Sequence, residues 1–171
     1  MSKKGIIKRL REVGVIYREP VKLTSGMVSA FYCDIKKAYG YPDILKSLAD
    51  EVGKKIPKAI TCIVAFGYGG VPLASLIASR FSKKLVMIRE IPKNHGRGGV
   101  IDGYIPTSKD RAVVMDDVLT TGGSIKMALA RLKKTRVKVV SAIVVVKRGE
   151  AKLPISYSCI FTIDEIKNSE T

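Results

Sequence analysis

The sequence predicts an α/β fold in which a central, mainly parallel sheet is flanked by helices. Short unbroken runs of apolar residues, many of them β-branched, alternate with segments in which apolar residues recur every three or four positions. Unbroken runs are typical of strands buried on both faces, and their alternation with amphipathic helices is typical of parallel sheets covered on both sides. Because the chain has 171 residues and no internal repeat or linker, we expect a single domain over residues 1–171.

The first 40 residues predict an extension that precedes the alternating pattern. Ile6, Leu10 and Val13 recur at helical spacing, so we expect an amphipathic helix over residues 3–13. A glycine and a proline separate this helix from residues 21–37, which we expect to be extended around a Ser-Gly turn.

The alternating pattern begins with a helix at Pro42, because proline is favoured in the first helical turn and apolar residues line one face behind it. Strands are expected over residues 59–66, 85–89, 111–115, 137–146 and 155–162, with helices over 71–81 and 124–133 and a short polar tail at the end. In such sheets, ligands bind beyond the carboxyl ends of the strands. Residues that follow a strand are therefore the first candidates for a functional site.

Composition favours a folded cytoplasmic protein without a membrane segment. Hydrophobic residues make up 46% of the chain, yet no apolar run is long enough to cross a bilayer, and the N-terminus lacks a signal-peptide pattern. Cys33, Cys62 and Cys159 are odd in number and far apart, which fits neither a zinc site nor a disulfide framework. We expect free thiols.

The chain is strongly basic, with 31 lysines and arginines against 15 acidic residues and a net charge of +16. This charge fits a solvated surface, attraction of a polyanionic small substrate, or nucleic-acid binding. The basic residues are scattered, and no basic motif interleaved with aromatic residues is present. The sequence therefore favours a charged surface that also attracts substrate, and nucleic acid is not the expected partner.

Residues 113–124 place two carboxylates, hydroxyls and glycines behind a strand. An apolar run leads to Asp116 and Asp117, and a loop of threonines and glycines follows before a helix begins at Ser124. Glycines let the backbone approach an anion closely, and N–H groups at a helix start bind it. Carboxylates repel phosphate, so they should face sugar hydroxyls or a hydrated cation. The stretch predicts a ribose 5-phosphate pocket; an ordinary polar turn is the alternative.

Two further stretches are candidates for binding anions. Residues 66–70 form a glycine-rich connection between a strand and a helix, which could hold a second anion or simply make a tight turn. Residues 89–99 lack helical or strand periodicity, carry several basic side chains and end in glycines. This composition is typical of a mobile cationic lid, and a solvated basic loop is the alternative.

Two other features could recognise a planar acidic base. Phe31 and Tyr32 follow a Ser-Gly turn and could stack on such a base, although packing into the fold explains them equally well. Arg148 follows a strand, and its guanidinium could bind a carboxylate through two hydrogen bonds; a surface arginine is the alternative.

In order and spacing, these stretches resemble the type I phosphoribosyltransferases over about residues 20–150. Residues 113–124 resemble their signature for phosphoribosyl pyrophosphate (PRPP). Arg89, Lys93, His95 and Gly96 match an element of the orotate phosphoribosyltransferases, and residues 23–34 resemble the N-terminal pattern of those enzymes. The resemblance implies the type I phosphoribosyltransferase fold, with a small N-terminal hood over residues 1–40 and a flexible lid, the mobile loop 89–103.

The resemblance also implies a role for each matching residue. Binding of PRPP is assigned to Arg89, Lys93, His95, Asp116, Asp117, Val118, Leu119, Thr120, Thr121, Gly122, Gly123 and Ser124, with Lys93, His95 and Asp117 as the catalytic residues. The pyrophosphate loop is Phe66, Gly67, Tyr68, Gly69 and Gly70. Orotate is assigned to Thr24, Phe31, Tyr32, Thr120 and Arg148. Mg²⁺ is carried by PRPP without a direct protein ligand, and a homodimer places lid residues at the neighbouring site.

The implied activity is transfer of the ribose 5-phosphate of PRPP to orotate in pyrimidine (UMP) biosynthesis. Three residues depart from the family pattern: Glu90 and Thr24 stand where lysines are found, and Lys147 stands where an aspartate is usual. These changes slightly favour an alternative, a non-catalytic regulator that senses PRPP or nucleotides and binds nucleic acid. A purine phosphoribosyltransferase is a second alternative, but it should lack the features of residues 24–34 and Arg148.

Overall fold

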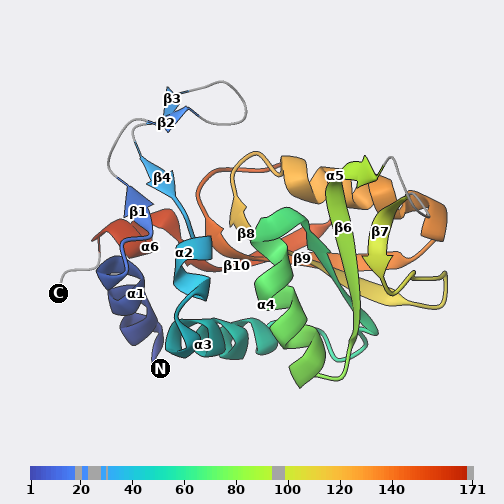
Figure 1. The fold of residues 1–171 in the computed structure, drawn as a ribbon, viewed down its shortest axis with the longest axis horizontal. Coiled ribbons are helices and arrows are strands. Elements are labelled where there is room, and N and C mark those ends of the chain that lie inside the picture. Colours follow the sequence, from blue (N-terminus) through green and yellow to red (C-terminus); the bar gives the residue numbers. More distant parts are fainter. Residues whose placement is uncertain (18–20, 23–27, 30, 94–98, 169–171) are drawn as a thin grey trace.

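The computed structural model describes residues 1–17, 21–22, 28–29, 31–93 and 99–168, and its centre is a six-stranded sheet with helices on both faces (Figure 1). The sheet has the order β10-β9-β8-β5-β6-β7, and every neighbouring pair is parallel except β6 and β7. Its strands are β5 (Cys62–Phe66), β6 (Lys84–Lys93), β7 (Gly99–Gly103), β8 (Arg111–Leu119), β9 (Lys138–Lys147) and β10 (Ser156–Thr162). The predicted mainly parallel α/β fold is confirmed.

Alternate side chains of the central strands enter two separate apolar layers. On β5, Ile63 and Ala65 pack into one layer, whereas Cys62, Val64 and Phe66 pack into the other. The first layer is covered by α1 (Lys3–Glu12), α3 (Pro42–Gly53), α4 (Gly67–Arg80) and α6 (Ile163–Asn168). Helix α5 (Gly123–Leu132) covers the second layer and is followed by a short 3-10 turn over Lys133–Thr135.

The N-terminal part forms small strand pairs outside the main sheet (Figure 1). Strand β1 (Ile16–Tyr17) pairs with β4 (Tyr32–Cys33), and β2 (Val21–Lys22) pairs with β3 (Val28–Ser29), both antiparallel. The expected Ser-Gly turn at residues 25–26 lies outside the described residues. The extended segment ends earlier than predicted, because α2 (Lys36–Tyr39) is helical.

Several predicted boundaries were wrong: strand β5 begins at Cys62 and not at residue 59, and other elements are longer than predicted. Strand β8 continues four residues past the predicted end, because β9 pairs with it as far as Leu119. The region 89–103, predicted as a loop, forms strand at both described ends, because the last residues of β6 and those of β7 pair along the sheet edge. The predicted polar tail contains helix α6, whose Ile163 and Ile166 are buried.

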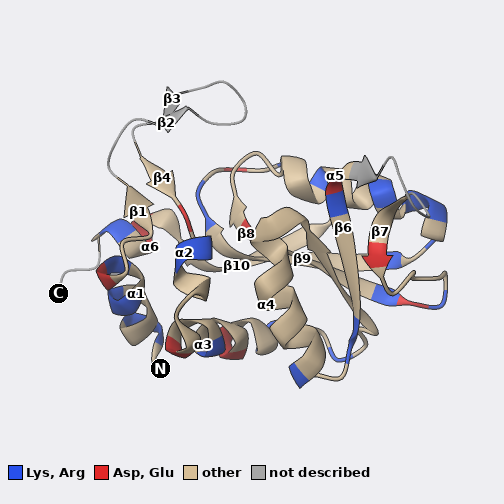
Figure 2. Cartoon of the chain, viewed as in Figure 1, with Lys and Arg blue, Asp and Glu red and all other residues tan. Residues whose placement is uncertain are grey.

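The glycine-rich stretch predicted as a loop forms the first turn of α4, so this helix begins at Gly67 rather than at residue 71. The central strands carry few charges, whereas α1 and α3 carry both signs (Figure 2). In the part of the chain that the structure describes, no helix combines the length and apolar character needed to span a membrane. Parallel pairing brings the carboxyl ends of β5, β8 and β9 to one edge of the sheet, where the predicted site residues gather.

Candidate active site

Two adjacent aspartates near the end of β8 form the centre of the candidate site. The apolar run before them is buried in the middle of the sheet, so it fixes the positions of Asp116 and Asp117. They lie within the strand, and not after it as predicted, because β8 continues to Leu119. The pairing of Asp116 with Val144 in β9 holds this end of the strand rigidly.

The carboxyl group of Asp116 is buried, with 7% of the residue exposed. One of its oxygens, Oδ1, accepts the N–H of Asp117 at 3.0 Å. Burial, followed by the negative charge of Asp117, raises the pKa of Asp116 well above the ordinary carboxyl value, while a hydrogen bond with Ser124 acts in the opposite direction. A raised carboxyl pKa of this kind is typical of a functional site.

The carboxylate of Asp117 is held from several sides. Oδ1 accepts the N–H of Val118 at 2.8 Å, and Oδ2 lies 3.4 Å from Nζ of Lys36. The group also rests on the first turn of α4, where a Cβ at Gly69 would lie 2.5 Å from Cγ of Asp117. Only a residue without a side chain fits there, so Gly69 is needed for this close approach.

The stretch from Thr120 to Ser124 connects β8 to α5. Gly122 is the N-cap of α5 and has a φ of 80°, a conformation that glycine adopts without strain. A Cβ at this position would also lie 2.7 Å from Cδ2 of Leu153. Among the described residues, none accepts a hydrogen bond from the backbone N–H groups of residues 121–124. These N–H groups can therefore bind an anion at the helix start.

The structure brings Arg148 and Phe31 together beside this loop. The carbonyl of Leu119 accepts the N–H groups of Arg148 at 2.8 Å and of Gly149 at 3.2 Å, which fixes the arginine next to the end of β8. The guanidinium of Arg148 lies 5.0 Å from the centre of the Phe31 ring, and Nζ of Lys167 lies 4.1 Å from the same centre. Both distances fall within the range of cation–π attraction.

The ring of Tyr32 contacts Tyr17 instead, with the two ring centres 6.3 Å apart. Of the two aromatic residues predicted to contact the base, Phe31 is therefore the one that lies beside Arg148. Of the other predicted base contacts, Thr120 lies at the start of the loop after β8, and Thr24 lies outside the described residues, as does His95 of the lid. The side chain of Lys93, at the end of β6, is also outside the described part.

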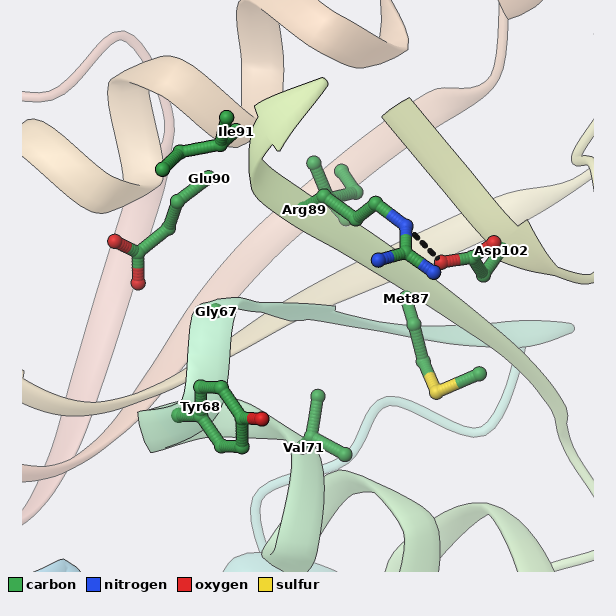
Figure 3. Close-up of a pocket in the computed structure, with 9 residues that line it drawn as sticks. Gly67, Tyr68, Val71, Met87, Arg89, Glu90, Ile91 and Asp102 are labelled. Atoms are coloured by element: carbon green, nitrogen blue, oxygen red, sulfur yellow. Dashed lines mark ion pairs between the residues drawn. The ribbon is translucent and has the colours of Figure 1, made fainter. Parts of the chain in front are cut away.

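Arg89 lies at a pocket of about 420 Å³ between α4 and the β6–β7 edge (Figure 3). Its guanidinium forms an ion pair with Asp102 of β7. Gly67 and Tyr68, two residues of the predicted pyrophosphate loop, also line this pocket. The carboxylate of Glu90 lies over Gly67, where a Cβ would collide with it. An acid thus lies beside the first turn of α4.

Two further residues near the aspartates were missed by sequence reasoning. Lys36 contacts Asp117, and the hydroxyl oxygen of Tyr39 is buried with no hydrogen-bond partner among the described residues. Burial, followed by the charges of Asp117 and Asp116, raises the pKa of Tyr39. No sequence signal singles out Lys36, because Lys37 stands beside it and the contact spans 81 residues.

Comparisons with known proteins identify the family of the chain. A model of the phosphoribosyl transferase domain matches residues 35–170. The orotate phosphoribosyltransferase of Methanocaldococcus jannaschii is 34% identical over 151 residues, covering 88% of this chain and 85% of the relative. That of Sulfolobus acidocaldarius is 36% identical over 155 residues, covering 86% and 77%. The crystal structure of orotate phosphoribosyltransferase from Aeropyrum pernix matches with a TM-score of 0.76 at 27% identity, covering 94% of this chain and 95% of its own. The chain belongs to the phosphoribosyltransferase family.

Proposed function

We propose that this protein is an orotate phosphoribosyltransferase, which converts orotate and PRPP into orotidine 5-monophosphate and pyrophosphate in UMP biosynthesis. The observation that carries this proposal is the juxtaposition of two parts of one site. The aspartate pair and the anion-binding helix start lie at the end of β8, and Arg148 with Phe31 lies directly beside them. The named relatives support the same substrate pair.

The end of β8 supplies the groups needed to hold the ribose 5-phosphate. The N–H groups of residues 121–124 and the hydroxyls of Thr120, Thr121 and Ser124 bind the phosphate, since donors at a helix start favour an anion. Asp116 and Asp117 accept hydrogen bonds from the ribose hydroxyls. Because positive charge develops on the ribose as pyrophosphate leaves, the nearby carboxylate of Asp117 also stabilises the transition state.

Arg148 recognises the carboxylate of orotate, because a guanidinium offers two parallel N–H donors to such a group. Phe31 holds the guanidinium in place through its ring face. A purine has no carboxylate, so this arrangement favours orotate over a purine base.

Mg²⁺ is proposed to reach the site with PRPP. Among the described residues, no group of three or more histidine, cysteine, aspartate or glutamate side chains could hold a metal ion. A magnesium ion can be bound mainly by substrate phosphates, so PRPP itself would carry the ion, and Asp116 and Asp117 would face the ribose hydroxyls. When bound, the ion neutralises charge on the leaving pyrophosphate.

Lys93, His95 and Arg89 are proposed to close over the pyrophosphate and exclude water, which would otherwise hydrolyse the activated sugar. The carboxylate of Glu90 adds negative charge close to the proposed pyrophosphate position, and we expect it to slow turnover. Lys93→Ala should therefore lower kcat strongly without lowering the unfolding temperature. A variant that unfolds, or one that retains full activity, would contradict the lid assignment.

A homodimer is proposed, with lid residues acting at the neighbouring site. Tyr68 and Ile91 are 88% and 80% exposed beside the pocket of Figure 3, which offers apolar surface to a second copy. Light scattering should give a dimer mass for the wild type and a monomer mass for Tyr68→Glu. We also propose a cytoplasmic location, which the three free cysteines support.

The direct test is to incubate the purified protein with PRPP, Mg²⁺ and orotate and to follow the loss of orotate absorbance. Loss that depends on PRPP is the expected result. Binding of PRPP without any loss of orotate would favour the regulator, and transfer to adenine or guanine instead would favour the purine enzyme.

A further inference from the structure

Helix α2, in the N-terminal part of the chain, approaches the aspartates of the site from outside the main sheet. Nζ of Lys36 lies 2.9 Å from Oδ1 of Asp34 and 3.4 Å from Oδ2 of Asp117. The lysine thus bridges the carboxylate that follows β4 and the carboxylate proposed to hold the ribose. The neighbouring Lys37 lies elsewhere, with its Nζ 5.4 Å from the centre of the Tyr17 ring.

This bridge differs from an ordinary surface ion pair. Exposed pairs contribute little, because water screens them and both side chains lose freedom. Here the acidic partner is largely buried, since only 14% of the Asp117 side chain is exposed, and its other oxygen already accepts the N–H of Val118. The contact with Lys36 therefore restricts the direction in which Oδ2 can accept further hydrogen bonds.

The electrostatic surroundings give the lysine a second effect. Two adjacent carboxylates repel each other, and a cation near one of them offsets that repulsion. Although burial opposes its charge, the hydrogen bond to Asp34 and the charge of Asp117 raise the pKa of Lys36, so the side chain remains a cation. Burial, followed by the charges of Asp117 and Asp116, also raises the pKa of the Tyr39 hydroxyl on the same helix. Helix α2 is thus electrostatically coupled to the site.

We propose that Lys36 is a positioning residue for PRPP binding, which orients the carboxylate of Asp117 to accept hydrogen bonds from the ribose hydroxyls. The lysine acts through Asp117 and is assigned no contact with orotate. This inference rests on the proposed function, which identifies PRPP as the ligand. It means that a residue of the N-terminal hood helps to determine affinity for PRPP.

The test compares Lys36→Met, Lys36→Arg and the matched control Lys37→Met with the wild type. Calorimetric binding of PRPP in the presence of Mg²⁺ is measured together with KM for each substrate. Loss of a charged hydrogen bond predicts that Lys36→Met weakens PRPP binding about tenfold or more. KM for orotate should stay near the wild-type value, Lys36→Arg should recover most of the affinity, and Lys37→Met should bind PRPP normally.

A double-mutant cycle with Asp117→Asn separates an indirect role from direct contact with PRPP. If Lys36 acts through Asp117, Lys36→Met should cause little further loss of PRPP affinity in the Asp117→Asn background. Additive losses, or a Lys36→Met protein that binds PRPP normally, would overturn the inference. Failure of Lys36→Arg to recover affinity would also overturn it.

The outcome for the proposed function can be distinguished from the outcome for Lys36. A wild type that binds PRPP but transfers nothing to orotate would contradict the proposed function, while the binding data would still decide the role of the lysine. A wild type that does not bind PRPP would overturn both.

Discussion

Strand β8 has a buried aspartate near each end, and the two are held in opposite ways. Asp110, immediately before the strand, is 4% exposed, and Asp116 is 7% exposed. Asp110 accepts the N–H of Thr107 and the hydroxyl of Tyr104, each at 2.9 Å, and its other oxygen accepts the hydroxyl of Thr61 at 2.9 Å. Among the described residues, Asp116 has one backbone donor, the N–H of Asp117, and the hydroxyl of Ser124, and it lies beside a second carboxyl group.

The difference shows how strongly nearby donors and charges affect the charge of a carboxyl group. The N–H of Thr107, together with hydroxyl donors, outweighs burial and holds the pKa of Asp110 well below its ordinary value. Burial and the charge of Asp117 raise the pKa of Asp116. A carboxyl group with a complete set of donors stabilises the fold, whereas one with an incomplete set can still accept hydrogen bonds from a ligand.

The largest expected effect on stability belongs to Asp110→Ala. Removing this carboxylate leaves several donors without their acceptor, which should lower the free energy of unfolding by about 3 kcal/mol. Urea denaturation measures this loss, and Asp164→Ala, which removes an exposed carboxylate, is the control. The transfer rate per folded molecule should stay at the wild-type level. A stable Asp110→Ala protein would contradict the structural role.

Asp117→Asn, at the other end of the strand, should lower activity rather than stability. The amide accepts hydrogen bonds more weakly than a carboxylate, and two ribose hydroxyls depend on this pair of acids. We expect kcat/KM for PRPP to fall about 100-fold. Thermal unfolding should show a stability close to that of the wild type, because loss of the contact with Lys36 and relief of repulsion between the acids act in opposite directions. Unchanged kinetics would remove Asp117 from the site.

The pH dependence of stability sharpens the comparison. The pKa of Asp116 is raised in the fold from the ordinary carboxyl value to about 8, so the folded protein keeps a proton that the unfolded chain has lost. The free energy of unfolding should therefore fall as pH rises from the ordinary carboxyl pKa to the raised value, by at most about 1.4 kcal/mol per pH unit. Urea denaturation at several pH values should show a smaller fall for Asp116→Asn, and an equal fall would contradict the raised pKa.

Asp110 should show the opposite pH dependence. Its pKa is lowered in the fold, so its contribution is present above the ordinary carboxyl pKa and is lost as pH falls toward the lowered value. Acid denaturation of Asp110→Ala should therefore be less steep than that of the wild type.

The smallest effect is expected for Lys84→Met. Nζ of Lys84 lies 3.4 Å from Oδ1 of Asp110, but half of the lysine side chain is exposed, so water screens the pair. The variant should lose little unfolding free energy, far less than Asp110→Ala. A loss comparable to that of Asp110→Ala would mean that the ion pair, and not the set of hydrogen bonds, holds the carboxylate.

Most of the main sheet could be predicted because its signal is local. Each central strand is a continuous apolar run, and such runs are buried whichever strand lies beside them. Strand β7 and the end of β6 carry no such signal, because they form an exposed edge that only their mutual pairing defines. Helix α6 was missed because its two buried isoleucines give too short a pattern.

The candidate site also has one part that the sequence predicts and another part that only the fold shows. Residue order alone indicated that Asp116, Asp117 and the following glycines form one ligand-binding unit, since all lie within a few residues behind one strand. The juxtaposition of Arg148 with Phe31 was expected only from the family resemblance, and their 5.0 Å separation comes from the fold.

The sequence by itself determined the class of the fold and the order of its central elements, and it singled out the stretch proposed to bind a sugar phosphate, because periodicity and short-range chemistry act between neighbours in the chain. Tertiary structure alone decided that Lys36 meets Asp117, that Gly69 makes room for that carboxylate, and that two buried aspartates have opposite pKa shifts. These properties depend on groups far apart in the sequence, whose distances exist only after the chain has folded.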